Sequence, residues 1–230
     1  MGRQLSIGNP PIVVNLKSST RAKRLSLRVS RLDGQVSLTV PALSAEREAL
    51  AFLREREAWL RKHLGDVRPK EPVGIGGKVM FGGVEVPIRA AMIKRARFQD
   101  GAFEVPDDPS QTGLRVKALL KLKARDALAA ASDGYAAELG RDYQRISLRD
   151  TRSRWGSCSS QGVLMYSWRL IMAPVDVLNY VAAHEASHLV EMNHSSAFWD
   201  TVAGLMPDFE VHRRWLRENG DRLHRYDFGR

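Results

Sequence analysis

The residues most capable of chemistry lie in the segment His184-Glu185-Ala186-Ser187-His188, an H-E-x-x-H pattern. On an α-helix, residues four apart are rotated by only about 40° and separated by about 6 Å along the axis, so both imidazoles project from one face. Two imidazoles so placed can bind one zinc ion at about 2.0–2.1 Å. Glu185 follows the first histidine, where a carboxylate can act as general base toward water that the metal makes acidic. The spacing predicts a helix with His184 and His188 as metal ligands and Glu185 as catalytic base.

A third histidine lies six residues beyond the second. A continuing helix would carry His194 about 9 Å along the axis from His188, too far to share one ion. The chain must therefore turn between them, and Met192-Asn193 is the expected place, because asparagine tolerates the left-handed conformation of helix ends. Ser195 can then cap a second helix. His194 would complete a set of three protein ligands with an open fourth position, which is typical of catalytic zinc sites, and Glu191 is the alternative third ligand.

A second distinctive segment, Arg-Ser-Arg-Trp-Gly-Ser-Cys, occupies positions 152–158. In a strand, Arg152 and Arg154 would share one face, and Trp155 would lie on the other. We expect Arg152, Arg154 and Trp155 to contact substrate, with a guanidinium that binds a carboxylate or phosphate or stabilises an oxyanion. The alternative is a structural salt bridge to a local carboxylate. Cys158 is either a fourth ligand, which would close the site, or a small buried residue.

The composition limits the classes of protein that fit. The chain has 230 residues, of which 43% are hydrophobic, enough for one large domain or two small ones. No run approaches the roughly 18 apolar residues of a membrane span. The single cysteine excludes an internal disulfide and favours a reducing compartment, so we expect a cytoplasmic protein. The formal net charge of +10 predicts weak nucleic-acid binding through the basic surface.

The local patterns place these residues in a chain of mixed structure. Asp33-Gly34 predicts a hairpin turn, and the Pro/Asp/Gly-rich stretch 106–113 is the expected boundary between two parts. Alternating or continuous apolar residues predict strands over 12–14, 25–29, 36–40, 79–81, 84–86, 146–148, 153–157 and 163–172. Helices are expected from Ser44 to about Leu64, from 114 to 139 with an interruption near Gly134, and from Pro174 through the metal motif.

Several ordered motifs resemble the YgjP-like metal-dependent hydrolase family, which is similar to the SprT-like and WLM-like zinc peptidases. The motifs are Thr151–Ser159, Ser167–Ile171, Tyr180-Val181 and His184–His194 followed by Ser195 and Phe198-Trp199. The resemblance is close from about Arg149 to Trp215 and looser over the N-terminal part. It implies zinc on His184, His188 and His194, with Glu185 as general base. The sequence departs from the family pattern at Ser167, where asparagine is expected, and at Ala186, where leucine is usual; neither position is a ligand.

Pattern and resemblance together predict an α+β fold. Residues 1–110 are expected to form a β-rich region with one helix, and residues 111–230 a zincin-like metallohydrolase domain with a small sheet packed on the metal-motif helix. The leading function is a zinc metallopeptidase that acts on a peptide or protein. One alternative is a metal-dependent nucleotide phosphohydrolase (a pyrophosphatase), which the arginines favour. Another is a nucleic-acid-binding module with structural zinc, which would not need Glu185.

Overall fold

The computed structural model describes residues 3–30, 32–42, 46–67 and 69–229 and divides the chain into two compact units, Met1–Pro69 and Lys70–Arg230. Each unit buries an apolar cluster of its own. The fold is mixed α and β, and the described residues form several small sheets and six α-helices. None of the described helices combines the length and apolar character that a membrane crossing requires.

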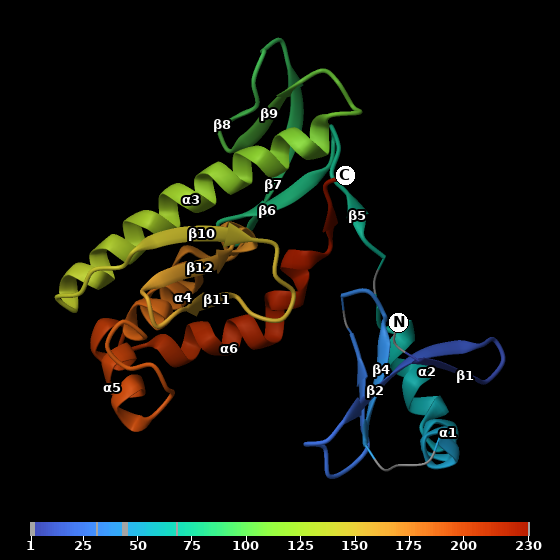
Figure 1. Ribbon diagram of the computed structural model, residues 1–230. Helices are drawn as coiled ribbons and strands as arrows, with labels where there is room; N and C mark the ends of the chain where they lie inside the picture. Colours follow the sequence, from blue (N-terminus) through green and yellow to red (C-terminus); the bar gives the residue numbers. More distant parts are fainter. Residues whose placement is uncertain (1–2, 31, 43–45, 68, 230) are drawn as a thin grey trace. The chain divides into compact units, whose positions relative to one another are not determined.

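The first unit is a four-stranded sheet with two helices (Figure 1). Its strand order is β1-β2-β4-β3, with β2 and β4 parallel and the outer pairs antiparallel. Alternate residues of β4, beginning with Val36, are buried, because successive side chains of a strand point to opposite faces. The elements are β1 (Arg3–Ile7), β2 (Ile12–Ser19), β3 (Ser26–Val29), β4 (Val36–Pro41), α1 (Glu46–Glu55) and α2 (Glu57–Gly65).

The predictions for this unit are mostly confirmed. The hairpin at Asp33-Gly34 joins the antiparallel pair β3–β4, and Gly34 has the positive φ of 67° that such turns use. The expected single helix is two helices, because the backbone of Arg56 leaves the helical range between them. Ser44, the expected cap, lies outside the described residues. Strand β1 was not predicted.

The second unit carries the H-E-x-x-H segment, residues 184–188. One sheet has the order β6-β7-β9-β8, a second has the order β10-β12-β11, and β5 pairs with β13. The strands are β5 (Glu71–Pro72), β6 (Lys78–Phe81), β7 (Val84–Ala91), β8 (Arg97–Gln99), β9 (Ala102–Pro106), β10 (Arg145–Arg149), β11 (Gly156–Cys158), β12 (Val163–Ser167) and β13 (Tyr226–Asp227). The helices are α3 (Thr112–Glu138), η1 (Trp168–Met172, a 3₁₀ helix), α4 (Val175–Ser187), α5 (Ser196–Leu205), α6 (Phe209–Asn219) and η2 (Gly220–His224, also 3₁₀).

The long helix α3 organises this unit. Every fourth residue from Val116 to Ala136 is buried, which gives the helix one continuous inward stripe. That stripe lies against α4 and η1, and Ser132 hydrogen-bonds to the Tyr166 hydroxyl at 3.0 Å. Gly134 does not interrupt the helix. The strand expected over 163–172 ends at Ser167, because the next five residues form the fully buried η1.

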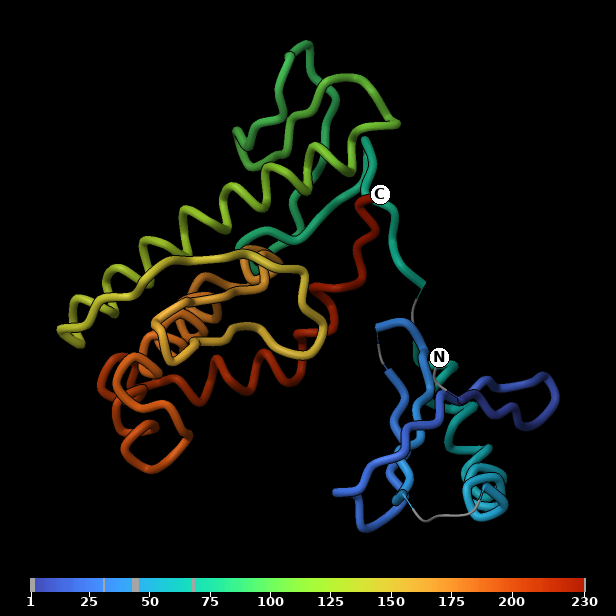
Figure 2. The backbone as a smooth tube through the Cα atoms, in the orientation of Figure 1, coloured from blue at the N-terminus to red at the C-terminus, as the bar shows by residue number. Residues whose placement is uncertain are grey.

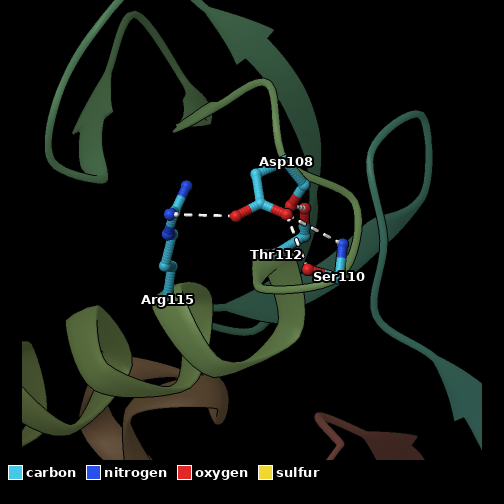
Figure 3. A network of polar contacts seen from close by, with 4 residues as sticks. All are labelled: Asp108, Ser110, Thr112 and Arg115. Carbon is cyan, nitrogen blue, oxygen red and sulfur yellow. Dashed lines mark hydrogen bonds and ion pairs between the residues drawn. The ribbon is translucent and has the colours of Figure 1, made fainter.

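The Pro/Asp/Gly-rich stretch 106–113 lies inside the second unit rather than between units. Figure 3 shows its polar network: the Asp108 carboxylate accepts hydrogen bonds from Ser110 and Arg115, and the Thr112 hydroxyl donates to the Asp108 carbonyl at 3.0 Å. The stretch is therefore a turn that side-chain hydrogen bonds stabilise and that leads into α3. The division at Pro69 differs from the predicted boundary near 110, because the strands before the turn share one apolar core with α3. Phe103 of β9 belongs to that core.

Candidate active site

Helix α4 delivers the first two histidines of the motif. It begins after Pro174 and packs with most of its surface buried, so the polar residues of its last turn lie inside the unit. His184 is half-buried and His188, the residue at the helix end, is 8% exposed. Their ring centroids are 5.2 Å apart. The predicted helix and the shared face of the two imidazoles are therefore present.

The chain turns earlier than expected after α4. Backbone N–H groups of Val190 and Glu191 both donate to the Ser187 carbonyl, so the helix closes in a tight turn at its own end. The expectation that Asn193 takes the left-handed conformation is wrong, since Asp100 is the only non-glycine residue with positive φ in the described part of the chain. The Asn193 side chain instead accepts the backbone N–H of Ser195 at 3.0 Å, immediately before α5. Ser195 stands at the cap position of α5, without a side-chain cap bond.

This turn returns His194 to the other two histidines. The Nε2 atoms of His194 and His184 are 3.2 Å apart. Two nitrogens bound to one tetrahedral zinc at about 2.0–2.1 Å are separated by about 3.3 Å, so this pair already has the spacing of two ligands. One ligand atom from each of His184, His188 and His194 lies within 4.8 Å of the others. The donor set and its spacing fit a zinc ion.

Glu191, the alternative third ligand in the sequence analysis, contacts the site through its main chain rather than its side chain. Its backbone carbonyl lies 2.9 Å from Nδ1 of His188, while its carboxylate is not part of the group of ligand atoms. A hydrogen bond from Nδ1–H to a carbonyl leaves the lone pair of Nε2 for a metal, which is the usual way a protein orients a histidine ligand. Glu191 thus orients His188 through its main chain.

Helix α5 adds an aromatic wall to the three histidines. The Phe198 ring centroid lies 4.9 Å from that of His184, 4.5 Å from that of His188 and 4.7 Å from that of His194. Trp199 stacks on His194 with centroids 5.7 Å apart. Burial lowers the pKa of His184 to about 3 and also lowers the pKa of His188. Both imidazoles are therefore neutral at pH 7, the form that binds metal.

The Glu185 carboxylate is buried between α4 and β11, with 5% of the residue exposed. Burial raises its pKa to about 8, although the charge of Arg154 and the backbone N–H of Cys158 oppose the shift. A Cβ at Gly156 would lie 2.4 Å from its Oε1 atom. Only glycine at this position of β11 leaves room for the carboxylate. Gly156 was not among the residues expected at the site, although a glycine inside a predicted strand indicates that another group approaches the backbone closely.

The segment Arg152–Trp155 is a loop before β11, so the prediction of a strand from Ser153 is wrong for its first residues. The Thr151 hydroxyl donates to the Arg154 carbonyl at 2.8 Å and bends the chain there. Arg154 and Trp155 line a pocket together with Glu185, whereas Arg152 does not. Trp155 also packs on His224, with ring centroids 5.3 Å apart.

Cys158 follows two residues after Gly156. It is a half-buried free cysteine that is not part of the histidine group. Burial raises its thiol pKa to about 11, which keeps it protonated. Cys158 contacts the site through its main chain, because its backbone N–H donates a hydrogen bond to the Glu185 carboxylate.

The pocket beside the histidines has a volume of about 340 Å³. Residues of α6, more than twenty positions after the motif, form one of its walls. These residues and Tyr180 were not expected from the sequence, because no local pattern marks a helix face that meets a pocket. The lining consists of Arg154, Trp155, Gly156, Tyr180, Val181, His184, Glu185, Arg213, Leu216 and Arg217.

The comparisons with known proteins define the class. The family model described as the YgjP-like metallopeptidase domain matches residues 23–219, most of the chain. The chain belongs to the YgjP-like metallopeptidase family. Among solved structures it is similar to the metallopeptidase zymogen abylysin of Pyrococcus abyssi, with 19% identity, a TM-score of 0.37, and coverage of 43% of this chain and 97% of that one. None of the curated protein sequences compared with the chain matches it significantly.

Proposed function

We propose that this protein is a zinc-dependent peptidase of the H-E-x-x-H type. His184, His188 and His194 hold the metal, and Glu185 is the general base that acts on water. The observation that carries the proposal is the convergence of three histidine nitrogens within 4.8 Å beside a buried carboxylate. Membership of a metallopeptidase family supports a peptide or protein as substrate.

The arrangement that supports this reaction is zincin-like. The motif helix α4 lies against β11, the strand at one end of the sheet order β10-β12-β11. A zinc ion bound by the histidines supplies Lewis acidity, which makes water acidic and polarises the scissile carbonyl. Phe198 packs on all three imidazoles and limits their rotation. His188 keeps its lone pair toward the metal through its contact with the Glu191 carbonyl.

A zinc ion held by the histidines would favour the carboxylate form of Glu185 and oppose the effect of burial on its pKa. In that form Glu185 accepts a proton from the attacking water and passes it to the leaving amine. The Cys158 N–H occupies one of its acceptor positions and fixes its orientation. A carboxylate offers about four such positions, so others remain for water. Arg154 and Trp155 line the same pocket, where they contact substrate. The free Cys158 fits a cytoplasmic protein.

The test compares the zinc-loaded protein with Glu185→Gln against a mixture of peptides and a panel of nucleotides. We expect peptide cleavage that a chelator abolishes. Glu185→Gln should bind zinc normally and lose roughly 10²-fold or more in turnover, the effect of losing a general base. Wild-type turnover in the variant would exclude the role of Glu185. Hydrolysis of nucleotides without cleavage of peptides would exclude the peptidase.

A further inference from the structure

The pocket beside the histidines is lined by three guanidinium groups. They come from two elements: Arg154 from the loop before β11, and Arg213 and Arg217 from α6. Glu185 is the single acidic residue in the lining, and it is buried. Within the described part of the chain, neither Arg154 nor Arg217 forms an ion pair. Among the described residues, the ion pair of Arg213 with Glu210 and the buried Glu185 still leave the pocket lining with a net positive charge.

The two arginines of α6 are one helical turn apart, about 6 Å along the axis, and reach the same pocket. Arg213 is held in place, because its guanidinium lies 4.5 Å from the ring centroid of Trp199 and 3.3 Å from Glu210. Trp199 in turn stacks on His194. The Trp199 ring therefore lies between the Arg213 guanidinium and His194, a candidate metal ligand.

The remaining walls suit an organic side chain. Val181 and Leu216 are apolar, and Trp155 and Tyr180 present aromatic rings. The Tyr180 phenol can donate a hydrogen bond. Apolar walls with a few charged groups at defined positions are typical of specificity pockets.

We propose that this pocket gives the peptidase a preference for a carboxylate beside the scissile bond. The carboxylate belongs either to an aspartate or glutamate side chain or to the free C-terminus of a short peptide. Arg213 and Arg217 bind it, and Arg154, whose charge acts on Glu185, lines the same pocket. This inference rests on the proposed peptidase function. Charge-assisted hydrogen bonds of this kind distinguish a carboxylate from its amide by about tenfold or more.

The first experiment measures binding by calorimetry, with the full-length zinc-loaded Glu185→Gln protein so that peptides stay intact. One pair of probes is acetyl-Ala-Ala-Glu-Ala-amide and its glutamine analogue. The other is acetyl-tetra-alanine as free acid and as amide. We expect the acid of at least one pair to bind about tenfold or more tightly than its neutral partner, and the pair that shows it identifies the source of the carboxylate. Equal affinities within both pairs would overturn the proposal.

The second step assigns the preference to named residues, in the same protein background. Arg217→Gln and the double variant Arg213→Gln/Arg217→Gln should reduce the preference, the double variant to within about twofold of none. Among the described residues, no aromatic ring packs on the Arg217 guanidinium, so this variant tests the effect of charge apart from packing. Arg214→Gln is the matched control, since Arg214 lies on α6 but does not line the pocket, and it should keep the full preference. An equal loss in the control, or a preference retained in the double variant, would refute the assignment.

Cleavage of an unbiased peptide mixture by the wild-type protein separates this inference from the proposed function. Sites cut only in the absence of chelator should be enriched in acidic residues or lie near free C-termini. Chelator-sensitive cleavage without such enrichment overturns the carboxylate preference and leaves the peptidase intact. Tight binding of a nucleoside triphosphate, with no cleavage of peptides, overturns both.

Discussion

The position of His194, the candidate third ligand, depends on a single turn of the chain. His194 reaches His184 because the helix closes at Ser187, and the same turn places the Glu191 carbonyl on His188. The two residues between which the sequence could not decide therefore have separate tasks. His194 supplies a ring nitrogen, whereas Glu191 supplies a main-chain oxygen, which a change of side chain does not remove.

His194→Ala should therefore weaken zinc binding far more than Glu191→Ala. The first variant removes a candidate ligand, while the second keeps the backbone contact to His188. Competitive titration with a chromogenic chelator measures both affinities on the same scale. A larger loss in Glu191→Ala would transfer the ligand role to that carboxylate.

The motif residues could be predicted from the sequence because helical periodicity is local: His184 and His188 are four residues apart, and Glu185 follows the first of them. The roles of Gly156 and Arg213 could not be predicted, since they depend on which distant elements pack together. Gly156 matters only because β11 lies against α4, and Arg213 only because α6 forms a wall of the same pocket. Such contacts are set by tertiary packing, on which periodicity carries no information.

At the level of elements, the loop before β11 packs against the 3₁₀ helix η2. Trp155 packs on His224, and a Cβ at Gly220 would lie 2.8 Å from the Trp155 ring. Arg169 fixes the same region, since it donates to the Asp150 carboxylate at 2.6 Å and to the Leu223 carbonyl at 2.9 Å. The pocket residue Trp155 thus depends on an element far from it in sequence.

This packing predicts a pH dependence of stability. Burial lowers the pKa of His224 to about 4, with Arg169, Arg152 and Lys70 acting in the same direction and Asp150 against it. The unfolded chain binds a proton near pH 6.5 and the folded chain near 4, so stability from the neutral ring is present above 6.5 and is lost as pH falls to about 4. The loss attributable to His224 is on the order of 3 kcal/mol.

Urea unfolding at several values between pH 7 and pH 4, for the wild type and His224→Phe, measures this contribution. The phenyl ring keeps an aromatic partner for Trp155 but does not titrate, so the variant should lose less stability across this range. Parallel curves for the two proteins would show that His224 does not carry the dependence. Asp150, whose pKa lies below its usual range because of Arg169, loses its contribution at lower pH.

At the level of the whole molecule, each unit has its own core. Leu53 is fully buried in the first. Leu53→Ala should destabilise that unit by about 2–5 kcal/mol, the usual effect of such a cavity. Hydrogen exchange should then show lost protection within residues 3–67, with zinc content unchanged. Val13→Ala is the control, since Val13 is 53% exposed. Equal loss of protection in the second unit would show that the two cores unfold together.

The net charge of +10 predicts general attraction to polyanions. Binding of a fluorescent duplex DNA should weaken steeply as salt rises, with the logarithm of affinity falling linearly against the logarithm of salt concentration. Arg154→Ala should change it little, because that contribution is spread over many cations. Fluorescence anisotropy across a salt series measures both effects. Binding that is insensitive to salt, or that depends strongly on Arg154, would contradict a general electrostatic attraction.

The pairing of β5 with β13 has a consequence for how the second unit is made. Strand β5, the first of this unit, lies beside the C-terminal residues of the same unit (Figure 2). The Glu71 N–H donates to the Arg225 carbonyl, and the Val73 N–H donates to the Asp227 carbonyl. Phe228 then packs on Trp168 and against Gly113 in the first turn of α3. During synthesis on the ribosome, the histidines leave the exit tunnel before these residues do. The nascent chain therefore exposes the histidine segment 184–194 before the residues that complete the surrounding core have been made.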